Sequence, residues 1–188
     1  LVCSYLGDRK EQQDAIYGSL VKDQAVAIVA DGMGGLKNGK CASNIAVKTM
    51  QELMATNPRK KNMQEFYFNS IKTVDSAVYT ACKSKGKSGT TIVSATINKN
   101  RLDWLSVGDS RLYLIKDNGM VQLTMDHNLK NYIERNKDDK ELIESLGPID
   151  ETKFEALTSY IGMNGVMFYD INTEEYNVRS GDYILLTT

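Results

Sequence analysis

The chain has 188 residues, a length that favours one domain, and 41% of them are hydrophobic, enough for a sizeable core. Lysine and arginine (23 together) nearly balance aspartate and glutamate (24), so a net charge of −1 disfavours bulk nucleic-acid binding. The longest fully apolar run is Ala25–Ala30, whereas a membrane-spanning helix needs about 20 residues, so we expect no membrane association. Three widely spaced cysteines and one histidine exclude a disulfide framework and a multi-histidine metal site. We expect reduced, mostly buried thiols in a cytoplasmic protein.

The first part of the chain is predicted to form strands and then helices. Two short mixed segments, 2–6 and 14–20, are predicted to be strands around a polar turn. The continuous apolar run 25–30 predicts a strand buried on both faces. Apolar residues at helical spacing predict one helix that begins near the candidate cap Asn38 and a second long helix over 63–81.

The second part changes to a period of two, which is typical of strands. The expected strands are 90–97, 102–107, 112–116, 121–124, 168–172, 176–179 and 183–187. Residues 128–146 have a helical pattern that is interrupted near 136–139. Because strands and helices come in blocks and do not alternate strictly, the sequence favours an α+β fold in which helices cover antiparallel sheets.

The strongest local feature is the glycine-rich turn Asp31-Gly32-Met33-Gly34-Gly35, directly after the predicted strand 25–30. The strand would hold the carboxylate rigidly, and the glycines let backbone groups approach a ligand closely. Such an oxygen-rich turn suits a hard divalent cation. A glycine turn with a capping aspartate remains the alternative. A dinucleotide fingerprint is excluded because its third glycine would fall on Lys37.

Three weaker features accompany this turn. Gly108-Asp109-Ser110 places a second acid on a tight turn after a strand. Gly7-Asp8-Arg9 followed by Gln12-Gln13-Asp14 places an arginine and an acid on one short loop, which alone would usually be a solvated loop. Lys87-Ser88-Gly89-Thr90-Thr91 is a small-residue entry to a strand. Gly86-Lys87-Ser88 could suggest a phosphate-binding loop, but this is rejected because the earlier glycine of that motif would fall on Ala81.

Together and in this order, these motifs resemble the metal-dependent PPM, or PP2C-type, serine/threonine protein phosphatases, and the match is closest to the bacterial branch. The resemblance spans residues 4–188, and six or more common motifs in order are highly specific. The landmarks are Gly7, Arg9, Gln12, Gln13 and Asp14, then Asp31–Gly35, Ser88–Thr91, Val107–Arg111, Leu123–His127, Leu157–Gly162 and Gly181–Leu186. The resemblance implies a PP2C-like sandwich of two antiparallel β-sheets flanked by helices, as a single domain over residues 1–188.

The same resemblance implies a catalytic metal centre with two Mn²⁺ or Mg²⁺ ions. Asp31 would bridge both ions, and the carbonyl of Gly32 would ligate one of them. Asp109 would ligate a third, weaker ion that many bacterial members hold. A water between two cations loses proton affinity, and the resulting hydroxide would attack phosphorus in line.

The resemblance also assigns roles around the ions. Arg9 would hold the phosphate through its planar fork, and Asp14 would orient metal-bound waters. Gln13 stands where some relatives use Glu as an outer metal contact, with one negative charge less. Met33 replaces a histidine that some eukaryotic relatives use as proton donor. His127 is predicted to be a turn or cap residue at a strand–helix junction.

The end of the sequence carries a further expectation. It stops at Leu185-Leu186-Thr187-Thr188, where the family continues with Asp-Gly and later Gly-x-Asp-Asn, both of which supply metal-binding acids. We therefore expect a C-terminally incomplete domain that lacks its C-terminal strand and helix. If the chain truly ends at Thr188, we expect weak or absent metal at one site and little turnover.

The leading hypothesis is a monomeric, cytoplasmic protein serine/threonine phosphatase, with phosphoprotein substrates and a Ser/Thr kinase and its targets as partners. Two alternatives stay open. The first is a catalytically impaired PPM-like module that binds and regulates a phosphoprotein or partner, as Gln13 and the missing acids suggest. The second is a cysteine-dependent phosphatase, because Cys3 and Arg9 satisfy the bare Cys-x₅-Arg pattern.

Overall fold

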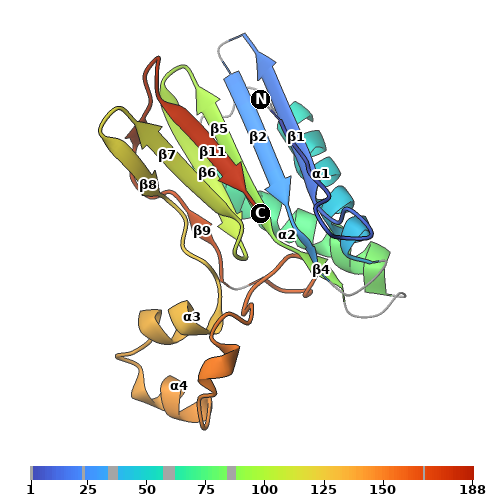
Figure 1. Cartoon of the computed structure of the whole chain (residues 1–188), viewed down its shortest axis with the longest axis vertical. Helices are drawn as coiled ribbons and strands as arrows, with labels where there is room; N and C mark the ends of the chain where they lie inside the picture. Colours follow the sequence, from blue (N-terminus) through green and yellow to red (C-terminus); the bar gives the residue numbers. More distant parts are fainter. Residues whose placement is uncertain (1, 23, 34–37, 57–61, 84–87, 167) are drawn as a thin grey trace.

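Two antiparallel sheets organise the molecule (Figure 1). The computed structural model describes residues 2–22, 24–33, 38–56, 62–83, 88–166 and 168–188. The larger sheet contains, in spatial order, β1 (Ala15–Val21), β2 (Gln24–Ala30), β5 (Ile92–Asn98), β6 (Arg101–Val107) and β10 (Tyr176–Asn177), while β9 (Asp170–Ile171) also pairs with β6. The smaller sheet has the order β11 (Tyr183–Thr187), β7 (Arg111–Lys116) and β8 (Gly119–Gln122). Two-residue strands, β3 (Gly32–Met33) and β4 (Gly89–Thr90), form a separate pair.

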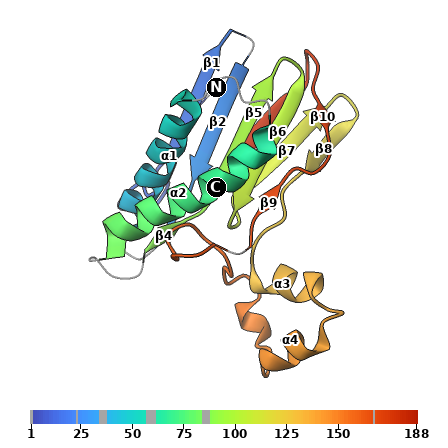
Figure 2. The same ribbon diagram turned by 180° about the vertical axis from the view of Figure 1, so that it is seen from behind.

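Two long helices, α1 (Gly39–Thr56) and α2 (Met63–Cys82), cover one face of the larger sheet (Figure 2). Each helix turns an apolar stripe inward, because its buried side chains recur every three or four residues. Tyr67 of α2 is fully buried there, and its hydroxyl lies 3.0 Å from Thr96 Oγ1. This polar contact satisfies the only polar atom of a large core side chain.

A second apolar core lies between the two sheets. It contains Val93, Ala95, Leu102 and Trp104 of the larger sheet together with Leu112 and Leu114 of the smaller one, and Val178. Alternate residues of β5 therefore face opposite cores, which explains its period of two. The predicted α+β sandwich of two antiparallel sheets flanked by helices is confirmed.

The prediction that residues 25–30 are buried on both faces is wrong in part. Ile28 and Ala30 are buried against the helices, but the remaining residues of β2 are only half-buried. An open groove of about 1010 Å³ separates β2 from β11, and Ala25, Ala27 and Leu186 are among its lining residues. The outer face of β2 is therefore less covered than a continuous apolar run suggests.

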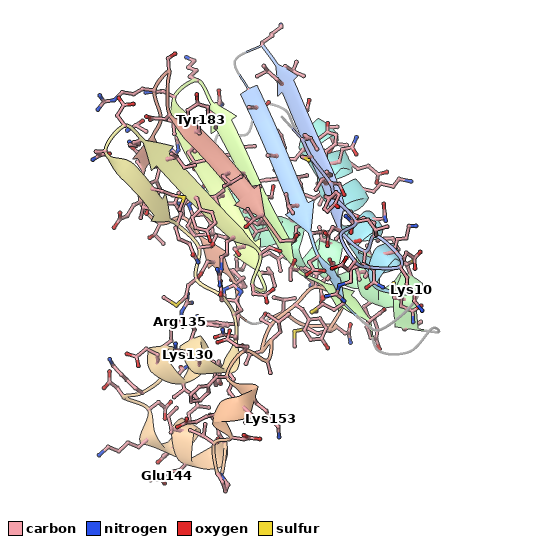
Figure 3. All side chains as sticks on the ribbon, viewed as in Figure 1. Lys10, Lys130, Arg135, Glu144, Lys153 and Tyr183 are labelled. Atoms are coloured by element: carbon pink, nitrogen blue, oxygen red, sulfur yellow. The ribbon has the colours of Figure 1, made fainter. Side chains whose placement is uncertain are left out.

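A separate helical segment projects from one end of the sandwich. It contains α3 (Leu129–Arg135), α4 (Lys140–Ser145) and a short 3₁₀ turn (Glu151–Lys153), and none of the described residues in these three elements is buried. Figure 3 shows Lys130, Glu144 and Lys153 on this segment, whereas Arg135 lies where the segment meets the sheets. The predicted interruption of the helical pattern near 136–139 is confirmed, since α3 ends at Arg135 and α4 begins at Lys140.

Most of the predicted elements form, with a few exceptions. Residues 2–6 form no strand, and 168–172 and 176–179 shorten to two-residue strands. The thiols also differ from the prediction, because Cys3 is exposed and Cys41 is half-buried, while Cys82 is buried. Among the described helices, none is both long and apolar enough to cross a membrane.

Candidate active site

Backbone hydrogen bonds fix Asp31 between β2 and β3. Its N–H donates to Thr91 Oγ1 at 2.9 Å. Its carbonyl oxygen accepts from Thr91 N at 2.9 Å and from Thr90 Oγ1 at 2.8 Å. Both backbone groups of Asp31 are thus held by the strand entry at residues 90–91, and none of these hydrogen bonds uses its carboxylate.

Gly32 and Gly39 let the start of α1 press directly against the Asp31 turn. A Cβ atom on Gly32 would overlap the carbonyl oxygen of Gly39 and would lie 2.6 Å from the carbonyl oxygen of Gln13. A Cβ atom on Gly39 would overlap the carbonyl oxygen of Gly32 and would lie 2.6 Å from Gln13 Oε1. The carbonyl of Gly32 and the amide of Gln13 therefore lie together at the first residue of α1.

One pocket of about 750 Å³ gathers most of the residues that the sequence singled out. Its lining residues are Tyr5, Leu6, Arg9, Lys10, Glu11, Gln12, Gln13, Asp14, Asp31, Gly32, Met33 and Thr188. Lys10, labelled in Figure 3, shows where this pocket lies in the molecule. The loop of residues 5–14 and the Asp31 turn thus bring an arginine, two aspartates and two glutamine amides to one cavity.

The electrostatics of this pocket favour a bound cation. Burial, then the neighbouring charges of Asp14 and Asp109, raise the pKa of Asp31 to about 6, while Arg9 acts in the opposite direction. The carboxylates therefore repel one another, and the charge of Arg9 offsets this repulsion only in part. Among the described residues, no three His, Cys, Asp or Glu side chains lie close enough to hold a metal ion, so carbonyl, amide or water oxygens must complete any cation site here.

Asp109 lies outside the lining of the pocket but close enough to affect Asp31. It sits on the turn between β6 and β7, its side chain is exposed, and Gly108 before it has a φ of 102°. Partial desolvation is the main cause that raises the pKa of Asp109, and the charge of Asp126 adds to it. The structure thus brings both predicted acidic turns to the same end of the sandwich.

Thr91 connects these two acidic turns, a role that the sequence did not predict. Its hydroxyl accepts from Asp31 N and lies 2.6 Å from the hydroxyl of Ser110, the residue after Asp109. Both Thr91 and Ser110 are buried. The sequence did mark Ser88–Thr91 as a motif, but it assigned no role to Thr91 within that motif.

We expect Thr91→Val to lower the free energy of unfolding by about 1–3 kcal/mol, because the buried hydroxyl of Ser110 and the partly buried N–H of Asp31 each lose a hydrogen bond. Urea unfolding followed by circular dichroism measures the loss. Thr91→Ser keeps the hydroxyl and is the matched control, so it should retain the contact with Asp31. A Thr91→Val protein as stable as the wild type would contradict this connecting role.

The prediction for His127 is wrong. The side chain of Asn128 caps α3, since it accepts from Asn131 N at 3.0 Å. His127 is instead fully buried, with its ring centroid 4.6 Å from that of Phe168. Residues 41 positions apart create this burial, so no local pattern could indicate it.

Cys3 and Arg9 do not form a common site. Arg9 lines the pocket that contains Asp31, whereas Cys3 lines a neighbouring cavity of about 410 Å³. Gly7, with a φ of 57°, turns the chain between them. A thiolate nucleophile needs phosphate-binding groups around its own sulfur, so this arrangement gives the cysteine hypothesis no support.

Comparisons with known proteins agree with the geometry. A family model described as Protein phosphatase 2C matches residues 5–146. The serine/threonine phosphatase stp of Listeria welshimeri is 34% identical over 113 residues, which cover 57% of this chain and 45% of that protein. Protein phosphatase PhpP of Streptococcus pneumoniae is 27% identical over 175 residues, which cover 88% of this chain and 66% of that protein. The chain spans about half the length of several curated relatives that it matches.

Solved structures show the same fold. The serine/threonine phosphatase of S. agalactiae matches with a TM-score of 0.73 at 25% identity, covering 95% of this chain and 73% of that one. Stp1 from Staphylococcus aureus matches with a TM-score of 0.76 at 24% identity, covering 96% of this chain and 71% of that one. The chain therefore belongs to the protein phosphatase 2C family, and its relatives include bacterial serine/threonine phosphatases.

Proposed function

We propose that this protein is a metal-dependent serine/threonine phosphatase that hydrolyses phosphoserine and phosphothreonine in proteins. The observation that carries the proposal is the pocket itself. Arg9, Asp14 and Asp31 line one cavity in which burial, and after it the neighbouring carboxylates, raise the pKa of Asp31 to about 6. Acids that repel one another beside an arginine suit a site that takes divalent cations and a phosphate.

Each residue has a chemical role in this proposal. Asp31 holds the cations through its carboxylate, with the Gly32 carbonyl as a further oxygen ligand and Asp109 as ligand of a weaker ion. Arg9 binds the phosphate and orients it, because a planar guanidinium donates two parallel hydrogen bonds to it. Asp14 and Gln13 orient waters at the cations. When bound, Mn²⁺ or Mg²⁺ supplies an activated water and neutralises charge on the phosphoryl group.

Other features of the protein enter the proposal through its relatives. A structure of the PstP catalytic domain is described as a complex with 2 manganese ions, which supports a pair of divalent cations for this fold. The names of the stp and PhpP relatives support phosphoprotein substrates, and we propose a Ser/Thr kinase as the opposing partner. We propose further that the chain acts as a monomer in the cytoplasm, as a single domain over residues 1–188. Thr188 also lines the pocket that contains Asp31.

A second candidate is a catalytically impaired module that binds a phosphoprotein without hydrolysing it. Two observations favour it: Gln13 carries no charge in the pocket, and no three acidic side chains cluster closely within the described residues. Such a module would keep Arg9 for phosphate binding and would lack turnover.

Removal of metal distinguishes these functions. We expect hydrolysis of a phosphothreonine peptide in the presence of Mn²⁺, complete loss of turnover with EDTA, and recovery when Mn²⁺ is added back. Release of inorganic phosphate measures the rate. Hydrolysis that is indifferent to EDTA would refute the metal-dependent reaction, and binding of the peptide without turnover would establish the module.

A further inference from the structure

We propose that His127 is a positioning residue that holds the Gly108–Asp109 turn, and that Asp170 fixes the orientation of its ring. The inference rests on the proposed function, because it concerns the site where Asp109 would bind the weaker ion. His127 touches neither acid of the pocket directly. It acts through the backbone of Gly108.

Two hydrogen bonds join His127 to Gly108. The N–H of Gly108 donates to His127 Nδ1 at 2.9 Å, and the N–H of His127 donates to the carbonyl oxygen of Gly108 at 3.0 Å. The imidazole thus accepts a hydrogen bond at Nδ1, which requires the tautomer that carries its proton on Nε2. His127 is fully buried, so water does not compete for these groups.

The carboxylate of Asp170 faces Nε2 of His127. This nitrogen is buried, makes no hydrogen bond within the described part of the chain, and lies 3.4 Å from Asp170 Oδ2. Burial alone would raise the pKa of Asp170, but the nearby imidazole of His127 and the hydrogen bonds that Asp170 receives from Arg135 lower it to about 2, so the carboxylate stays charged. A charged acceptor beside Nε2 favours the tautomer that leaves Nδ1 free to accept from Gly108.

Neighbouring side chains hold this arrangement in place. Arg135 of α3 donates to both carboxylate oxygens of Asp170, at 3.0 and 2.8 Å. Its guanidinium carbon also lies 4.6 Å from the ring centroid of Phe168. The Phe168 ring in turn packs against the ring of His127. Figure 3 shows Arg135 at the junction of the α3–α4 segment with the sheets. A chain of contacts therefore runs from α3 through Asp170 and His127 to the turn of Asp109.

The turn is held on both sides of Asp109. His127 holds Gly108 before it, and Thr91 contacts Ser110 after it. The exposed carboxylate between them is therefore presented by a rigid backbone. Loss of either hydrogen bond would widen the range of positions of the Asp109 carboxylate and weaken the binding of the ion that it would ligate.

Substitutions that keep or remove the Nδ1 acceptor test this inference in the full-length protein as its gene encodes it. The carbonyl oxygen of His127→Asn can take the place of Nδ1, whereas His127→Leu offers no acceptor. Titration of Mn²⁺ followed by electron paramagnetic resonance measures each class of site. We expect His127→Leu to lower the Mn²⁺ affinity of the weaker class of site about 10–100-fold, and His127→Asn to retain most of the wild-type affinity. Asp170→Asn should also lower the Mn²⁺ affinity of this class of site, because a neutral amide no longer enforces the His127 tautomer that carries its proton on Nε2.

Two further measurements separate positioning from stability. Thermal unfolding reports whether the variants fold, and hydrogen exchange of the Gly108 amide reports the bond to Nδ1. We expect this amide to stay protected in His127→Asn and to exchange faster in His127→Leu. If His127→Leu does not fold, His127→Asn and Asp170→Asn still decide the question, through the protection of Gly108 and the affinity of the weaker class.

The outcomes distinguish this inference from the proposed function. If Mn²⁺ binds the wild type and every His127 and Asp170 variant equally well, the positioning role is overturned while the proposed function stands. If His127→Asn loses as much affinity as His127→Leu, the acceptor at Nδ1 is not what matters, and the inference fails. If the wild type binds no Mn²⁺, the proposed function fails, and this inference fails with it.

Discussion

Asp31→Asn is expected to abolish Mn²⁺-dependent hydrolysis, with kcat/KM reduced at least about 100-fold. The amide keeps the shape of the side chain but removes the charge that would hold the cations. The same change should stabilise the metal-free protein at pH 7, because the pKa of Asp31 is raised from 3.8 to about 6 and its charged form is therefore unfavourable in the folded state. Since Asp31 is only partly buried, we expect a gain of about 1–2 kcal/mol.

The pH dependence of this gain provides a check. A raised folded-state pKa costs stability as the pH rises through the interval between about 4 and 6, so the advantage of Asp31→Asn should vanish below about pH 4. Urea unfolding in EDTA at several pH values measures it, and phosphate release with Mn²⁺ measures activity. Asp117→Asn removes the same charge from the exposed turn between β7 and β8 and is the matched control. An Asp31→Asn protein with wild-type turnover would end the proposed metal chemistry.

Gly32→Ala is expected to lower the free energy of unfolding by about 3 kcal/mol. The added methyl group would overlap the carbonyl oxygen of Gly39 and would crowd that of Gln13, and backbone atoms cannot rotate away as a flexible side chain can. Relief requires α1 to move away from β3, which would also displace the Asp31 turn. Urea unfolding measures the loss, and Mn²⁺ affinity should fall with it.

Gly18→Ala is the matched control for this change. Gly18 lies in β1, and among the residues that the structure describes a Cβ atom there would meet only the side chain of Val2, at 2.9 Å. That side chain is exposed and can rotate away, and alanine restricts the unfolded chain, so we expect a neutral to slightly stabilising effect. If Gly32→Ala proves as stable as Gly18→Ala, the close packing of α1 on the site is wrong.

The long elements were predictable because their information is local. The apolar stripes of α1 and α2 and the alternation along β7 follow from burial of one face, and the period of two along β5 and β6 follows from two cores on opposite faces of the sheet. Residue spacing records both patterns directly. Short elements were not predictable in this way. β3 and β4 pair Gly32 with Thr90, so their hydrogen bonds depend on residues that are far apart in sequence.

The candidate site divides in the same manner. The ordered motifs, through the family that they resemble, indicated Arg9, Asp14 and Asp31, and the structure places all three on one pocket. The sequence motifs could not indicate that Asp109 lies outside the lining of this pocket, or that Thr91 joins the two acidic turns, because both facts depend on how β4, β5 and β6 pack together.

His127 shows the limit most clearly. From its neighbours it resembles an ordinary polar residue before a helix, and the adjacent Asn128 does cap α3. Its burial comes from Phe168, and its orientation comes from Gly108 and Asp170, none of which is a neighbour in sequence. Composition, spacing and periodicity thus specified the fold class, the acidic turns and the long elements, since these depend on local preference. Long-range packing specified which groups are buried, which backbone atoms meet and which acids interact, since burial and hydrogen bonding depend on whatever the folded chain places alongside.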